Sequence, residues 1–143
     1  MNTKTLLAAL AAGVFSFLLG WVVWDMLGLM DYFAKNTTAE YNALMKGPES
    51  MSLPGLFLSN LVMGLLLAWA LGRMNASTWM GGLVAGAMFG ALITLSYDLF
   101  FHSMMNMFTG TSIMVVDVLV AAVTTGLTGA VAGFVLGTGK KTA

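Results

Sequence analysis

Residues 79–101 read WMGGLVAGAMFGALITLSYDLFF, an apolar run with a single charged residue, Asp98. A helix needs about 20 apolar residues to cross the roughly 30 Å hydrocarbon core of a bilayer. Hydrocarbon offers no water to the backbone, so a segment of this kind must close its own hydrogen bonds as a helix. The stretch therefore predicts a membrane-spanning helix with one carboxylate near its end.

Three other apolar segments reach spanning length, at residues 5–30, 54–71 and 113–136. Only 8% of the chain is charged, against about a quarter of a soluble domain, so water is not the solvent for most of its surface. The N-terminal run imitates a secretory signal after Lys4, but it extends to about Met30, too far for a signal core. The sequence predicts one all-α domain, residues 1–143, folded as an integral membrane four-helix bundle with one sizeable outer loop at 31–53.

Local signals mark the start of the second span and a short helix before it. Ser52 is expected to cap the span, and Pro54 lies at an early helical position where its missing N–H costs nothing. Within the outer loop, Thr37 or Thr38 is expected to cap a surface helix that ends at Gly47.

The charged residues lie unevenly around the predicted spans. One side is flanked by basic residues alone, namely Lys4, Arg73, Lys140 and Lys141. The other side has Lys35 and Lys46 and carries or adjoins all six acids, Asp25, Asp31, Glu40, Glu49, Asp98 and Asp117. Because loops on the cytoplasmic side collect Lys and Arg, both termini and the Arg73 turn are expected to be cytoplasmic.

The sequence pattern indicates one helical hairpin that is repeated in tandem. The segments that align without gaps are 12–27 with 85–100, and 64–72 with 129–137. The first alignment superposes two aromatic-Asp pairs, Trp24-Asp25 and Tyr97-Asp98. A duplication would give parallel hairpins related by a pseudo-twofold axis along the membrane normal, as in some transporters. Coincidence among apolar residues is the alternative.

Two rows of glycine at four-residue spacing occur in the third and fourth spans, Gly82, Gly86 and Gly90 in one and Gly129, Gly133 and Gly137 in the other. Small residues so placed let helix backbones approach closely in lipid. The rows are expected to face each other and pinch the cytoplasmic half of the bundle. Bulky outer side chains, among them Trp21, Tyr97 and Phe100, are expected to hold the outer halves apart around a hollow. Contact between copies of the chain through one row is the alternative.

Four ionisable residues are candidates for a proton or cation site, Asp25, Asp98, His102 and Asp117. Ionisable groups inside spans are costly and often mark ion or proton paths. Asp25 and Asp98 are equivalent in the alignment, and His102 shares a helix face with Asp98. Hydrated interfacial carboxylates are the alternative for these two aspartates. Asp117 is expected to open the fourth span, at the positive end of the helix dipole.

A second candidate site combines an imidazole with thioethers, at His102, Met104, Met105 and Met107. Soft ligands of this type suit Cu(I), and flexible apolar packing is the alternative use of methionine. No nucleophile-base arrangement, phosphate loop or multi-histidine motif is present in the sequence, so neither an enzyme nor a bound cofactor is expected. Zero net charge and the lack of a basic run disfavour nucleic acid as a partner.

Ala12-Gly13, Gly20-Trp21 and Trp24, followed by a polar outer loop and three further spans, resemble small bacterial four-helix membrane proteins of unknown function. The resemblance implies a bacterial inner (plasma) membrane and no established activity. The expected function is that of a non-enzymatic accessory module in the lipid bilayer, working with copies of itself or with a larger membrane protein. The alternatives are a proton- or cation-coupled transporter or channel, and Cu(I) handling.

Overall fold

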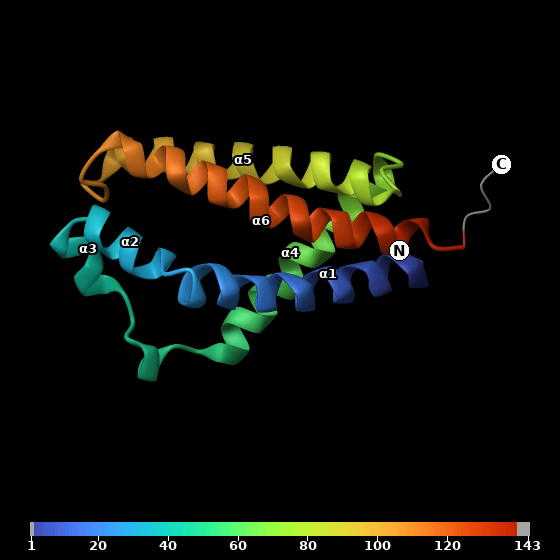
Figure 1. Ribbon diagram of the computed structural model, residues 1–143, viewed down its shortest axis with the longest axis horizontal. Coiled ribbons are helices and arrows are strands. Elements are labelled where there is room, and N and C mark those ends of the chain that lie inside the picture. Colours follow the sequence, from blue (N-terminus) through green and yellow to red (C-terminus); the bar gives the residue numbers. More distant parts are fainter. Residues whose placement is uncertain (1, 140–143) are drawn as a thin grey trace.

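Four helices between residues 2 and 139 are long and apolar enough to cross a membrane. The computed structural model describes these residues. In one bundle, α1, α5 and α6 lie lengthwise, and α4 runs obliquely to them (Figure 1). The helices are α1 (Thr3–Trp21), α2 (Leu29–Asn36), α3 (Ala39–Leu44), α4 (Leu53–Arg73), α5 (Trp79–Met104) and α6 (Thr111–Gly137), with a π-helical turn η1 (Val22–Met26) and a 3-10 turn η2 (Pro48–Ser50). The prediction of four spanning helices is confirmed.

Side-chain caps set the starts of three long helices. Asn2, Ser52 and Thr78 each accept a hydrogen bond from the backbone N–H three residues further on, at 2.9, 3.2 and 3.0 Å. Such a cap satisfies an N–H that has no partner within the helix. The predicted cap at Ser52 is confirmed, with Pro54 in the first turn of α4.

The first span ends before Met30, its predicted end. α1 continues into η1, and the helix stops at Leu27 because Gly28 adopts a left-handed conformation with a φ of 71°. That conformation is open to glycine and costly for a residue with a Cβ atom. The chain then starts α2 at Leu29, outside the span.

The segment between the first two spans is folded and tied to the α5–α6 turn. Thr38 caps α3, as one of the two expected caps, but α3 ends at Leu44 and not at Gly47. Thr37 pairs with Phe108 in a short antiparallel bridge, and the Thr38 N–H donates to a carbonyl of the same turn at 3.0 Å. The outer loop is thus held against the second hairpin.

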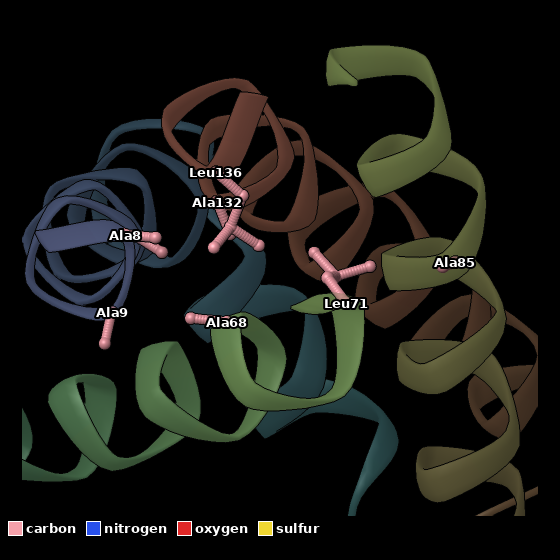
Figure 2. Close-up of a cluster of buried hydrophobic side chains, with 8 residues drawn as sticks. Ala8, Ala9, Ala68, Leu71, Ala85, Ala132 and Leu136 are labelled. Atoms are coloured by element: carbon pink, nitrogen blue, oxygen red, sulfur yellow. The ribbon is translucent and has the colours of Figure 1, made fainter. Parts of the chain in front are cut away.

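The core shared by all four long helices lies at the end of the bundle that carries the N-terminus and Arg73 (Figure 1). Figure 2 shows that small side chains from each helix meet there. The cluster consists of Ala8, Ala9, Ala12, Ala68, Leu71, Ala85, Ala132 and Leu136. Because most of these are alanines, the helix backbones come close together. The expected close approach of the helices is therefore found at this end.

The bundle consists of two hairpins that pack together unevenly. α5 packs most extensively on α6 and α1 packs on α4. α1 also lies along α6, whereas α4 makes little contact with α5. The buried residues of α4 all lie between Gly64 and Leu71, and residues 52–59 are exposed. The outer half of α4 therefore leans away from α6.

Three of the outer aromatic side chains point away from the bundle. Trp21, Tyr97 and Phe100 are 61%, 60% and 56% exposed. The prediction that they hold the outer halves apart is therefore wrong. Their positions on the outside suit amphipathic rings at a membrane interface.

Candidate functional site

The glycines of α5 bring its backbone against that of α6. Each lies against two α6 residues spaced four apart, Gly82 with Gly129 and Gly133, Gly86 with Thr125 and Gly129, and Gly90 with Ala121 and Thr125. A Cβ atom at Gly82, Gly86 or Gly90 would lie closer than 3.0 Å to a backbone oxygen of α6. On α6, Gly137 lies against the carbonyl of Ser77 at the turn before α5. Both glycine rows are therefore in contact within one chain.

This register continues outward to two aspartates. Each step of four residues forward along α5 corresponds to four residues back along α6. Asp98 lies eight residues, or two such steps, beyond Gly90. The same register places it against Ile113 and Asp117. Asp98 and Ile113 are 3% and 1% exposed, and the side chains of Asp98 and Asp117 lie within hydrogen-bonding reach of each other. We call Asp98 and Asp117 the carboxyl pair.

The carboxyl pair lies inside the spans and not at their ends. Asp98 comes six residues before the end of α5 and Asp117 six residues after the start of α6. At 1.5 Å per residue, each is about 9 Å from the end of its helix. Helices of 26 and 27 residues exceed a 30 Å hydrocarbon core by about 5 Å at each end when centred. In a bundle centred in this way, the pair would lie about 4 Å below the edge of the hydrocarbon.

One carboxylate oxygen of the pair lacks a partner. Asp98 Oδ2 is buried and makes no hydrogen bond with any residue from 2 to 139. An unpaired buried polar atom costs about 1–3 kcal/mol, and two adjacent carboxylates repel each other when both are charged. A proton shared by the two carboxyl groups, or a small cation bound to them, would remove both costs.

The other residues of the predicted proton or cation site lie apart from the carboxyl pair. Asp25 is exposed in η1, and His102 is exposed one turn beyond Asp98. No hydrogen bond joins His102 to Asp98 within the described part of the chain. The structure thus brings Asp98 together with Asp117 and not with Asp25, although all were candidates.

The expectation that Asp117 opens the fourth span is wrong. α6 begins at Thr111, and Asp117 lies in its second turn. The helix dipole acts on charges mainly within the first turn. The dipole therefore does not explain a carboxylate at this depth.

The methionine segment is divided between surface and interior. Met104 and Met105 are 70% and 54% exposed, and His102 is also exposed. Met107 packs instead against the cluster of Phe108 and Ile113 under the outer loop. Apolar packing accounts for Met107, while the two exposed methionines have no such role in the described structure.

Four long apolar helices, with a carboxyl pair between two of them, define the class of this chain as a multi-pass helical membrane protein. No family model, curated protein or solved structure matches the chain. The resemblance to small bacterial four-helix proteins therefore stays a prediction.

Proposed function

We propose that the chain is a non-enzymatic membrane protein that binds a proton or a monovalent cation between Asp98 and Asp117. The observation that carries this proposal is the Asp98 carboxyl group, which is 3% exposed, lies inside a span and has an unpartnered oxygen beside a second carboxyl group. Ionisable groups in such positions usually belong to ion or proton pathways. No ion pair links either aspartate to a basic side chain within residues 2–139.

Access to the carboxyl pair is from the outer end of the bundle. Asp117 is only partly buried. A shallow hollow beside Tyr32 is lined by its neighbours Val116 and Val120 on α6, and neither aspartate lines this hollow. Toward the other end, the glycine contacts and the shared core close the space between the helices. With the termini and the Arg73 turn on the cytoplasmic side of a bacterial inner membrane, the exchange would occur on the periplasmic side.

We infer that the two hairpins derive from one repeated hairpin. The alignment pairs Ala9, Gly13 and Gly64 with Gly82, Gly86 and Gly129. A Cβ atom at Gly64 would meet the carbonyl of Ala9 and the Cα of Gly13, and one at Gly129 would meet the carbonyl of Gly82 and the Cα of Gly86. These contacts correspond residue by residue, which supports a repeat over coincidence among apolar residues.

Burial supports the same relation between α4 and α6. Gly64, Leu67, Ala68 and Leu71 are buried, and so are the aligned Gly129, Ala132, Gly133 and Leu136. The way in which the hairpins pack does not repeat, because α1 lies along α6 while α4 barely touches α5. We therefore propose a repeat of the contacts between the two helices of each hairpin. We do not propose a pseudo-twofold axis that relates the packing of the two hairpins to each other.

Self-association is the other expected activity. The glycine rows that could mediate it are in contact within the chain, so a second copy or a larger membrane partner would have to use another surface. The carboxyl pair is the more specific feature and decides the proposal.

A hydrophobic carbodiimide tests the protonated state of the carboxyl pair. This reagent reacts with protonated carboxyl groups in apolar surroundings, so we expect one adduct per chain, on Asp98 or Asp117, located by peptide mass spectrometry. Asp25→Asn should leave the adduct unchanged because Asp25 is exposed in η1. Protection by Na⁺, K⁺ or Li⁺ would identify a cation as the bound species. Labelling that persists at full yield in the Asp98→Asn/Asp117→Asn variant would contradict the proposal.

Transport is tested in proteoliposomes that contain a pH-sensitive or cation-sensitive dye. We expect Asp98→Asn and Asp117→Asn each to reduce proton or cation flux at least tenfold, which corresponds to about 1.4 kcal/mol. Asp25→Asn is the matched control, since it removes a carboxylate at the same end of the bundle. Flux in the double variant equal to that of the wild type would exclude the carboxyl pair from the pathway.

A further inference from the structure

A polar hollow lies at the opposite end of the bundle from the carboxyl pair. It is lined by Lys4 near the start of α1, by Trp69 and Arg73 near the end of α4, and by Leu136 of α6. Its volume of about 330 Å³ is at the lower end of the range for small-ligand sites. Two helices, α1 and α4, therefore place one cationic side chain each beside the same space.

No carboxylate among residues 2–139 neutralises these two cations. Lys4 Nζ donates a hydrogen bond to the carbonyl of Thr138, and the Arg73 guanidinium lies over the Trp69 ring, with Cζ 6.0 Å from the ring centroid. Neither pairs with a carboxylate in residues 2–139, and Arg73 makes no hydrogen bond with any of these residues. The five N–H donors of Arg73 are therefore available to a ligand.

The depth and the walls of the hollow indicate what the ligand is. Arg73 is the last residue of α4 and Lys4 is in the first turn of α1, so both side chains lie at headgroup level. Trp69, one turn deeper and 49% exposed, and Leu136 give the hollow an apolar wall on the membrane side. The guanidinium fork binds phosphate oxygens in pairs, and the lysine adds a point charge.

From this arrangement we propose that the hollow binds the phosphate group of an anionic phospholipid. The basic side chains would hold the phosphodiester, and the apolar wall would take the start of the acyl chains. A free phosphate ion offers the same charge without the apolar part. This proposal does not depend on the carboxyl pair, which lies at the other end of the bundle.

The test is native mass spectrometry of the purified full-length protein in detergent, titrated with phosphatidylglycerol or phosphatidylcholine. We expect preferential binding of phosphatidylglycerol. Each of Lys4→Gln and Arg73→Gln should weaken that binding about fivefold, and the double variant about 25-fold, because one cation near anionic lipid contributes about that factor. Lys35→Gln/Lys46→Gln is the matched control, since it removes the same charge from the outer loop.

Equal binding of the two lipids, or equal weakening by the two double variants, would overturn the proposal. A separate arm adds inorganic phosphate as a competitor. Displacement of phosphatidylglycerol only at high phosphate concentration supports a lipid site, whereas tight phosphate binding with no preference for the lipid overturns it. Arg73→Lys keeps the charge and should lose less affinity than Arg73→Gln, which separates phosphate recognition from a change in stability.

Discussion

Gly129→Leu is expected to lower the thermal unfolding midpoint of the protein in detergent by about 10 °C or more. A Cβ atom at position 129 would lie 3.0 Å from the Cα of Gly86 and closer still to the carbonyl oxygen of Gly82. These are backbone atoms, so no rotamer change relieves the clash, and α5 and α6 must separate. Overpacking of this kind costs about 3 kcal/mol or more, which corresponds to a shift of about 10 °C. Circular dichroism or a fluorescence-based melt measures it.

Gly20→Leu is the matched control for this change. Gly20 also lies in a spanning helix, but a Cβ atom there would meet nothing within 4 Å. The same side chain would then point into lipid, and the midpoint should stay near that of the wild type. Equal destabilisation by the two substitutions would show that the contact between α5 and α6 does not determine the result.

The spans could be predicted from the sequence because the bilayer imposes one simple condition on each of them. A segment that crosses hydrocarbon must be apolar over about 20 residues, and hydropathy alone reveals this. The ends of the spans depend on local geometry. Gly28 ends the first span through a positive φ that Gly20, inside the span, does not adopt. The sequence does not show which glycine ends a helix and which glycine lies inside one.

The carboxyl pair could be predicted only in part. Asp98 and Asp117 were both candidates, but the alignment of the hairpins directed attention to Asp25 and Asp98. Equivalence in a repeat means that two residues occupy the same place in their own hairpins, and it does not imply that they touch. If the alignment of 64–72 with 129–137 is continued without gaps toward the start of each helix, Asp117 corresponds to Ser52, the cap of α4. Only the second hairpin therefore contains two acids at this level.

The signal that identifies the pair is the spacing of the glycines. Once the row from Gly82 to Gly90 faces α6 in steps of four, the same steps reach Asp98 and then its partner on α6. In a straight helix that row drifts around the axis by about 40° per step. Asp98 is nevertheless buried at the end of this row. The line of contact between α5 and α6 therefore turns around α5 together with the row of residues spaced by four. The relative winding of two helices is a tertiary property, so this step required the structure.

Two introduced cysteines should be joined almost completely by a short thiol-specific crosslinker in Asp98→Cys/Asp117→Cys. The native chain contains no cysteine, so no other thiol competes. Chemical cleavage at methionine then separates the peptide 89–104 from the peptide 115–143 unless the crosslink holds them together. Mass spectrometry before and after reduction identifies the linked pair, and the expected result is conversion of nearly all chains.

Asp25→Cys/Asp98→Cys is the decisive comparison, because it tests the pairing that the repeat alone favours. It should give no linked product of the peptides 2–26 and 89–104, since Asp25 is exposed in η1 and the buried Asp98 faces α6. If this variant were linked as readily as Asp98→Cys/Asp117→Cys, the aspartates would share a cavity between the hairpins, and the proposed site between α5 and α6 would be wrong. If only the Asp98 and Asp117 positions are linked, one hairpin supplies both carboxyl groups. Proton or cation binding would then depend on the same close contact of α5 and α6 that Gly129→Leu disrupts.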